Sequence, residues 1–373
     1  MLSTDMSKAF DSLHPKLLLT KMKAYGLSDP ALKLMQSYFS NRENRTRVGN
    51  STSAWGALKR GCPQGSSLGP LLWNIYQNDL FYAGVKSQLS AYADDHQLYS
   101  SNKELRTAID EVEKDGAKTS NWYKSNFLEG NYSKYQAMII VRDTQQTELV
   151  INNSKIDITD AFKLLGVIID KDLNFTEHIS QVCLKTSKMI GVLRRLKNLI
   201  PIHAKLRIYK TAILPHLTYC SLVWHFCRAS DTRKLERVNE RGLRTVFCNR
   251  VSSYSDLLIH AGMTSLYNKR FQEIAIFMFK VKHRLLPSNV LELFPRSPSS
   301  YSLRSSDFYV PRVRTVKYEK HSLRFLWPLM WSKLDNRDKK EMSLQQFKAN
   351  IRERDLSGFV GGNTCKGCHL CNS

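Results

Sequence analysis

The spacing of hydrophobic and polar residues over the first 60 positions predicts two helices followed by an extended region. Apolar residues recur at helical spacing over residues 14–25, and Gly26 is a typical helix stop. A second helix is predicted to begin at Pro30, in the first turn after a capping serine and aspartate, and to end near Phe39. Residues 46–58 are predicted to be extended, with a break near a glycine.

The next hundred residues mix loop, helix and strand patterns. Glycine, proline and serine predict a loop at residues 61–67, and alternation with β-branched and aromatic residues predicts short strands further on. The predicted elements are a helix over 68–81, two strands around a tight acidic turn over 88–100, a charged helix over 102–126, and strands over 135–141 and 162–169.

Beyond residue 172 the pattern becomes helical, and we predict a domain boundary there. Helices are predicted over 175–199, 202–214, 232–247 and 266–286. A loop rich in Pro, Ser and Arg follows over about 287–314, and a last segment around Trp327, Trp331 and Phe347 closes the chain.

Charge adds an asymmetry to this picture. The 373 residues carry a net charge of +23, which favours nucleic acid or an anionic membrane as a partner. Residues 1–172 hold 21 Lys and Arg against 19 Asp and Glu, whereas residues 173–373 hold 35 against 14. We expect the second half to grip a polyanion and the first half to hold metal ions.

Other features favour an intracellular protein. No basic stretch followed by an apolar one marks a signal peptide at the start of the chain. No apolar run of about 18 residues predicts a transmembrane helix. The eight cysteines are interpreted as reduced thiols. We expect a nuclear or cytoplasmic location and leave the oligomeric state open.

Two adjacent carboxylates, Asp94 and Asp95, stand in the acidic turn between the two predicted strands. Like charges so close raise each other's pKa unless a cation neutralises them. Mg²⁺ binds one or two carboxylates together with phosphate oxygens. Taken alone, the pair is equally compatible with an ordinary Asp-Asp turn.

Two further strings precede this pair. Asp5 opens the sequence Asp-Met-Ser-Lys-Ala-Phe-Asp, and residues 61–72 read Gly-Cys-Pro-Gln-Gly-Ser-Ser-Leu-Gly-Pro-Leu-Leu. A distant aspartate that folds beside a pair of aspartates suits two-metal phosphoryl transfer. A glycine-rich loop lets the backbone approach a nucleotide closely.

The order of these three strings resembles motifs A, B and C of reverse transcriptases. Their details are similar to those of jockey-like and related non-LTR retrotransposons. The resemblance implies an α+β fold: a palm with an antiparallel sheet packed on helices over 1–172, a mostly helical thumb over 173–286, and a basic C-terminal region over 287–373. It also implies an RNA-directed DNA polymerase that uses two Mg²⁺ ions, dNTPs, an RNA template and a DNA primer.

Site residues follow from the same resemblance. Asp5 and Asp94 are expected to hold the metal ions, with Asp95 assisting. Lys134 matches a lysine that can donate a proton to the leaving pyrophosphate, although a plain surface lysine is nearly as well supported.

Nucleotide contacts are expected from two other strings. Phe10 matches the steric gate that rejects a 2′-hydroxyl, with a core aromatic as the alternative. Gln64 and Gly65 match the loop that contacts the incoming nucleotide and the template. Residues 164–167 resemble the primer-grip hairpin.

Basic pairs in the thumb region recur at spacings that can share a helix face, which suits phosphate contacts. For any single pair, a solvated helix surface is the favoured interpretation. The pairs are Lys185 and Lys188, Arg194 and Arg195, and Arg241 and Arg244.

The tail holds Cys365, Cys368, His369 and Cys371, which are zinc-type ligands. Their spacing lacks a second ligand pair, so a disordered tail is favoured over a zinc site.

The sequence departs from the family pattern at its start. The family's palm follows fingers whose basic residues grip the triphosphate, whereas this chain begins four residues before Asp5. We therefore expect a late start or a truncated copy, an unpaired sheet edge beside Asp5, and inefficient polymerisation by the chain alone. A non-catalytic nucleic-acid-binding remnant and an intron maturase are the alternatives.

Overall fold

The structure is a computed structural model that describes residues 1–140, 148–196, 198–296, 307–312, 322–335, 339, 343–356 and 358. The chain divides into two compact units, Met1–Phe162 and Lys163–Ser373. This division lies ten residues before the predicted boundary near 172. Within the described ranges, no helix is both long and apolar enough to cross a membrane.

Unit 1 is built on a six-stranded sheet with the order β6-β7-β1-β8-β10-β9. All neighbouring strands are antiparallel except β8 and β10. The strands are β1 (Leu2–Thr4), β6 (Gln88–Tyr92), β7 (Asp95–Tyr99), β8 (Gln136–Ala137), β9 (Leu149–Ile151) and β10 (Ser154–Ile158).

Helices accompany this sheet and share its hydrophobic core, so the predicted α+β class is confirmed. They are α1 (Ala9–Ser12), α2 (Pro15–Ala24), α3 (Asp29–Phe39), α4 (Gly69–Gln77) and α5 (Leu105–Ser125), with 3-10 turns at Asn78–Tyr82 and Tyr132–Lys134. The helices predicted at 14–25, 30–39, 68–81 and 102–126 are therefore confirmed, except that the third tightens into a 3-10 turn after Gln77.

The strand β1 lies in the middle of the sheet, although only three residues form it. Leu2 pairs with Leu98 of β7 on one side and with Ala137 of β8 on the other. The expected unpaired sheet edge beside Asp5 is therefore wrong, because partner strands from later in the chain cover both sides of β1. Gly116 of α5 packs closely on this strand, since an added Cβ would lie 3.1 Å from the Leu2 side chain.

A chain of buried hydrogen bonds connects β1, β7, α4 and α5. The Tyr123 hydroxyl lies 2.8 Å from Thr4 Oγ1 and 2.7 Å from His96 Nδ1, and His96 Nε2 lies 3.0 Å from Gln77 Oε1. The Gln77 carbonyl oxygen only accepts, so Nε2 carries the proton and Nδ1 accepts from Tyr123. The Thr4 hydroxyl also donates to the His96 carbonyl at 3.3 Å, and all four side chains are buried.

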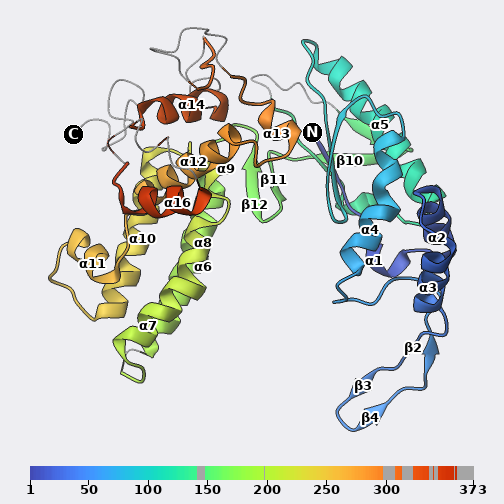
Figure 1. Cartoon of the computed structure of the whole chain (residues 1–373), viewed down its shortest axis with the longest axis horizontal. Coiled ribbons are helices and arrows are strands. Elements are labelled where there is room, and N and C mark those ends of the chain that lie inside the picture. Colours follow the sequence, from blue (N-terminus) through green and yellow to red (C-terminus); the bar gives the residue numbers. More distant parts are fainter. Residues whose placement is uncertain are drawn as a thin grey trace. The chain divides into compact units, whose positions relative to one another are not determined.

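A second part of unit 1 has no core of its own. The strands β2 (Glu43–Asn44) and β5 (Gly56–Ala57) pair, as do β3 (Arg47–Val48) and β4 (Ser51–Thr52). Figure 1 shows β2, β3 and β4 projecting beyond α2 and α3. Every residue from 43 to 60 is exposed. The extended segment predicted over 46–58 is confirmed.

The hairpin of β11 (Ala161–Leu164) and β12 (Val167–Asp170) spans the start of unit 2, which is helical beyond it. The single strand predicted over 162–169 therefore turns back at Leu165 and Gly166, both with positive φ. The helices are α6 (Thr176–Arg195), α7 (Ile202–Ile208), a π-helical turn (Tyr209–Ile213), α8 (Leu214–Thr218), α9 (Ser221–Trp224), α10 (Ala229–Phe247), α11 (Tyr254–Ala261), α12 (Leu266–Lys282), α13 (Ser288–Leu291), α14 (Leu323–Lys333) and α16 (Leu344–Glu353).

The helix predicted over 202–214 differs from the structure in one respect. It runs on to Thr218 through a π-helical turn at Tyr209–Ile213. Pro215 has no N–H to donate to the carbonyl four residues earlier, which interrupts the regular ladder of hydrogen bonds there. The helices predicted over 175–199, 232–247 and 266–286 are confirmed as α6, α10 and α12.

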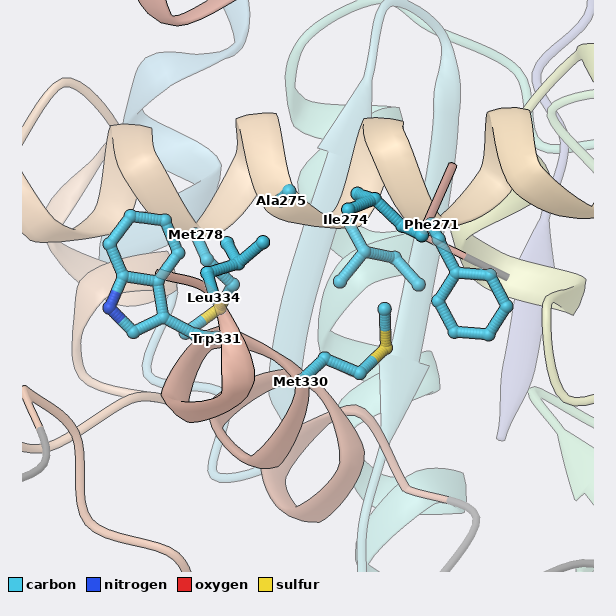
Figure 2. A pocket seen from close by; sticks show the side chains of 8 residues that line it. Phe271, Ile274, Ala275, Met278, Met330, Trp331 and Leu334 are labelled. Carbon is cyan, nitrogen blue, oxygen red and sulfur yellow. The ribbon is translucent and has the colours of Figure 1, made fainter. Parts of the chain in front are cut away.

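The last helices pack on α12 through aromatic and sulfur-containing side chains. Figure 2 shows Phe271, Ile274 and Met278 of α12 facing Met330 and Trp331 of α14 around a small apolar cavity. The rings of Phe279 and Phe347 stack with centroids 4.3 Å apart, which adds α16 to the same core. The predicted closing segment is thus part of a hydrophobic core.

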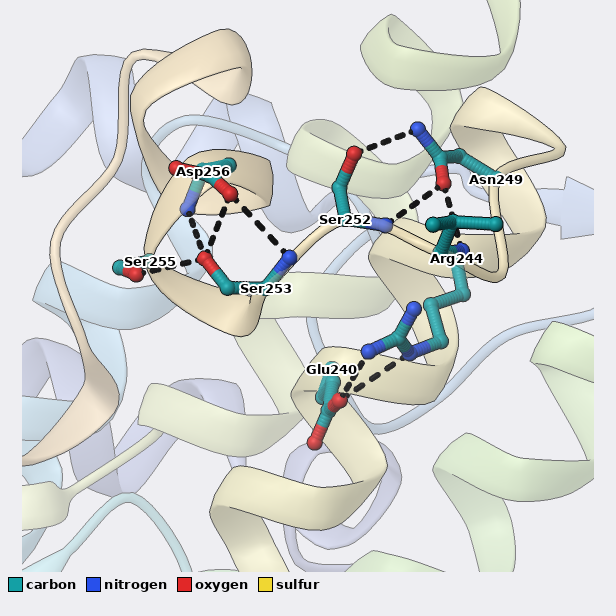
Figure 3. A network of polar contacts seen from close by, with 8 residues as sticks. Glu240, Arg244, Asn249, Ser252, Ser253, Ser255 and Asp256 are labelled. Atoms are coloured by element: carbon teal, nitrogen blue, oxygen red, sulfur yellow. Dashed lines mark hydrogen bonds and ion pairs between the residues drawn. The ribbon is translucent and has the colours of Figure 1, made fainter.

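The junction of α10 and α11 is shaped by polar contacts (Figure 3). Arg244 donates from Nε and Nη2 to Glu240 Oε1 at 3.0 and 2.7 Å. The Asn249 side chain accepts from the backbone N–H groups of the turn, and Ser253 and Asp256 form the capping box that starts α11. Arg244 is therefore committed to a carboxylate on its own helix.

Two glycines in neighbouring helices give a matched test of packing in unit 2. An added Cβ at Gly242 of α10 would lie 2.4 Å from the ring of Tyr209, which is buried and hydrogen-bonded to Asn239. We expect Gly242→Ala to lower the free energy of unfolding by about 1–3 kcal/mol. Gly191 of α6 has open space, so Gly191→Ala should raise it by about 0.5–1 kcal/mol. Urea unfolding measures both, and a stable Gly242→Ala variant would contradict this packing.

The pH dependence of unit 1 should report His96. Burial lowers the pKa of His96 from 6.5 to about 4. The unfolded chain therefore takes up a proton as the pH falls through 6.5, whereas the folded protein resists until about pH 4. The free energy of unfolding should fall across this window by up to about 3 kcal/mol.

Urea unfolding at several pH values tests this expectation. His96→Gln should remove that part of the slope, and His260→Gln, at an exposed histidine, should leave it intact. Equal slopes for the wild type and His96→Gln would show that His96 does not resist protonation.

Candidate active site

The tight turn between β6 and β7 presents the paired aspartates. Tyr92 and Asp95 are cross-strand partners, so Ala93 and Asp94 form the turn itself. Ala93 adopts a φ of 53°, an uncommon conformation for a residue other than glycine. Trp73 of α4 donates from Nε1 to the Ala93 carbonyl at 2.7 Å, which holds the turn in place.

The register of β1 against β7 brings the third carboxylate to the same place. Thr4 pairs with His96, so Asp5 leaves the end of β1 beside Asp95. Burial raises the pKa of Asp95, and the charges of Asp94 and Asp5 raise it further. The three predicted carboxylates therefore share one electrostatic site, and each is half-buried.

Lys134 reaches this site from the segment after α5. Its Nζ lies 3.2 Å from Asp5 Oδ2. The backbone supports this contact, because Asn131 N–H donates to the Asp5 carbonyl and Met6 forms a β-bridge with Gly130. In this position, Lys134 partly neutralises Asp5.

The donor set suits a hard divalent cation. Carboxylate oxygens are ligands that Mg²⁺ prefers, and one or two of them suffice when phosphates and water complete the octahedron. In the part of the chain that the structure describes, no three Asp, Glu, His or Cys side chains are arranged as the ligands of one ion. The carboxylates thus offer part of an Mg²⁺ coordination shell, and among the described residues they do not form a complete metal site on their own.

The loop predicted to contact the nucleotide is tied to the segment that follows Asp5. The N–H groups of Gly61 and Cys62 donate to the carbonyls of Leu13 and Phe10 at 2.8 and 3.1 Å. Gly61 has a φ of +77°, and an added Cβ would lie 2.8 Å from the Asp11 Cα. Only glycine fits this approach of two backbones.

Gln64 and Gly65 lie exposed beyond this anchor. Gln64 donates from Nε2 to Asp11 Oδ1 at 2.9 Å. Gly65 has a φ of +78° with open space around it. The loop therefore presents backbone and amide groups to solvent.

Phe10 connects the segment that follows Asp5 with the turn that carries Asp94. Its half-buried ring packs against Trp73 with centroids 5.2 Å apart. The same Trp73 holds the Ala93 carbonyl, so Phe10 is connected to the turn that carries Asp94. This position is compatible with both the steric gate and the core aromatic considered from the sequence.

Two predicted sites differ in how far the structure describes them. The hairpin expected at 164–167 is present, and its tip is held by Tyr219, whose hydroxyl donates to the Leu165 carbonyl at 2.8 Å. Cys365, Cys368, His369 and Cys371 lie outside the described residues.

Sequence reasoning missed the buried layer beneath the carboxylates. His96 directly follows Asp95, and Thr4 directly precedes Asp5, so alternation along each strand points both side chains away from the site and into the core. The sequence signal for this layer is the polar residue beside each aspartate, Thr4 before Asp5 and His96 after Asp95.

Comparisons with known proteins agree with the motifs. A family model described as reverse transcriptase (RNA-dependent DNA polymerase) matches residues 1–169. The chain is 25% identical over 316 residues to the probable RNA-directed DNA polymerase from transposon BS of Drosophila melanogaster, covering 78% of this chain and 34% of that protein. It is 26% identical over 258 residues to the RNA-directed DNA polymerase from mobile element jockey of Drosophila funebris, covering 65% and 28%.

A solved telomerase from Candida albicans, in complex with a fragment of telomeric RNA, covers 73% of this chain and 48% of its own at 12% identity, with a TM-score of 0.30. The chain spans about a third of the length of the curated relatives that it matches. Over residues 1–169 the chain is therefore similar to reverse transcriptases, and over a longer stretch it is similar to the polymerases of jockey and other non-LTR transposons.

Proposed function

We propose that the chain carries out RNA-directed DNA synthesis. The 3′-hydroxyl oxygen of a DNA primer would attack the α-phosphate of a dNTP, and pyrophosphate would leave. The carrying observation is the placement of Asp5 beside the Asp94-Asp95 turn by the β1–β7 register. The match of residues 1–169 to the reverse transcriptase family model supports the same reaction.

Asp5 and Asp94 would hold two Mg²⁺ ions, with Asp95 assisting. When bound, the ions would stabilise the attacking and leaving oxygens. Burial and the charges of Asp94 and Asp5 raise the pKa of Asp95, and a cation among the three carboxylates would relieve the repulsion between them.

The other expected roles follow from position. Lys134, which lies at the carboxylate cluster, would donate a proton to the leaving pyrophosphate. Gln64 and Gly65 would contact the incoming nucleotide, and Phe10 would stand against its 2′ position. The loop is exposed, and its anchor to residues 10–13 keeps it close to the segment that follows Asp5.

Template and primer would be RNA and DNA, bound in the nucleus or cytoplasm. Residues 173–286 would act as the thumb, and residues 287–373 would add basic charge. Lys185, Lys188, Arg194 and Arg195 of α6 are exposed and suit phosphates. Arg241 donates to the Ser187 hydroxyl and Arg244 is paired with Glu240, so that pair suits phosphates less.

Metal binding tests the site independently of polymerisation. Mg²⁺ should bind the wild-type chain and raise its melting temperature, because a ligand of the folded state stabilises it. Asp94→Asn and Asp5→Asn should each weaken Mg²⁺ binding about tenfold or more, as measured by calorimetry, and should lower any primer extension on an RNA template about a hundredfold. Asp157→Asn, at an exposed carboxylate of β10, is the matched control. Unchanged Mg²⁺ affinity in both site variants would overturn the proposal.

Sugar selection tests Phe10. Removing the ring by Phe10→Ala should admit ribonucleotides, so the ratio of dNTP to rNTP incorporation should fall by about tenfold or more in primer extension. Phe81→Ala, at an exposed aromatic of the same unit, should leave the ratio unchanged. A lowered melting temperature with an unchanged ratio would assign Phe10 to the core instead.

A further inference from the structure

The segment from Arg42 to Arg60, here called the basic arm, buries almost none of its side chains. Residues 43–60 are all exposed, and the arm consists of two separate pairs of two-residue strands. A two-stranded ribbon without a hydrophobic face is marginal in water. The arm therefore adds accessible surface to the protein and contributes little to the stability of the fold.

The arm is strongly cationic. It carries Arg42, Arg45, Arg47, Lys59 and Arg60 against one carboxylate, Glu43. This concentration is unusual in the first half of the chain, where basic and acidic residues nearly balance. A flexible polyanion is the complementary ligand.

An aromatic platform lies within this charge. The Trp55 side chain is 60% exposed, although it is among the largest apolar side chains of the protein. The Arg45 guanidinium lies over its ring, 4.6 Å from the centroid. An exposed tryptophan beside arginine is the combination on which unpaired bases stack, because every base has a π face.

The base of the arm is fixed to the candidate active site. Arg42 donates from Nη2 to the carbonyls of Arg60 and Gly61 at 2.9 and 2.6 Å, and Leu58 N–H donates to the Arg42 carbonyl at 2.7 Å. Gly61 is in turn bonded to Leu13. The arm thus ends where the loop of Gln64 and Gly65 begins.

We propose that the basic arm binds single-stranded nucleic acid next to the polymerase site. A base would stack on Trp55 beside Arg45, and Arg47, Lys59 and Arg60 would contact phosphates. Unpaired bases are required, because a duplex hides their faces. That the strand is a template rests on the proposed function, whereas the binding itself does not.

A protein partner fits the arm less well than a nucleic acid. The large apolar side chains that the arm exposes are Trp55, Val48 and Leu58, and they are interspersed with cations. The core of a protein interface is depleted of charged residues, so this mixture does not form an apolar patch for a protein.

Photo-crosslinking locates the contact directly. The full chain would be mixed with single-stranded RNA containing 4-thiouridine, in EDTA so that no catalysis intervenes, irradiated and digested for mass spectrometry. We expect crosslinked peptides within residues 42–60, and their disappearance in Trp55→Ala. Crosslinks in the basic second half provide an internal positive control. Crosslinks there with none in the arm would overturn the proposal.

Affinity and salt dependence provide the second measurement. Arg45→Ala/Arg47→Ala should weaken binding of single-stranded RNA or DNA several-fold and should reduce the slope of log affinity against log salt by about 0.7 for each phosphate that the variant no longer neutralises. Tyr82→Ala/Lys103→Ala changes an exposed aromatic and an exposed cation elsewhere in unit 1 and is the matched control. An unchanged slope in the arm variant would contradict the proposal.

Two further outcomes are decisive against it. Preferential crosslinking of the arm to duplex RNA would exclude the stacking geometry. Self-association of the chain that Trp55→Ala abolishes would assign the arm to a second copy. Loss of arm binding with intact Mg²⁺ affinity would leave the proposed polymerase site standing, so the two proposals fail separately.

Discussion

The candidate site depends on one antiparallel register, that of β1 against β7. Pairing of Thr4 with His96 sets Asp5 beside Asp95, and a shift of β1 by one residue would turn the side chains of β1 to the opposite face. Three residues of β1 could not fix this register alone. The hydrophobic pairing of Leu2 with Leu98 and Ala137, and the buried hydrogen bonds from Thr4 to Gln77, fix it from beneath.

The two faces of this strand pair have opposite electrostatic requirements. On the buried face, a neutral His96 completes a chain of hydrogen bonds, and burial lowers its pKa to about 4. On the other face, the pKa of Asp95 is raised by burial and by its two neighbours. The buried layer with His96 thus excludes charged groups, whereas the adjacent layer brings the three carboxylates together. Lys134 brings a cation to the edge of the cluster through its ion pair with Asp5.

Much of this arrangement could be predicted from local sequence. Periodicity located α2, α3, α5, α6 and α10, because each is amphipathic over several turns, whereas α12 is buried on most of its surface. The motifs pointed to Asp5, Asp94 and Asp95, because three such strings in this order resemble those of reverse transcriptases. Strands β9 and β10 were missed, because each is short and gains its stability from a sheet assembled by distant segments.

Other features of the structure can be recognised only in three dimensions. The central position of β1 depends on β8, which lies more than 130 residues later in the chain, and nothing near Leu2 indicates it. The ion pair between Glu240 and Arg244 changes the interpretation of a basic helix face, because the pattern alone counts charges without their partners.

Two regions of unit 1 concentrate charge of one sign, and a ligand of the opposite charge would stabilise each of them. The carboxylate cluster gains from a cation, and the basic arm gains from a polyanion. The chain joins them through Gly61, whose position against the Asp11 backbone leaves no room for a side chain. A nucleic acid held by the arm would add its phosphates near the anchor of the nucleotide loop, whereas metal ions would offset the negative charge of the carboxylates. Each ligand would thus reduce the electrostatic cost of binding the other.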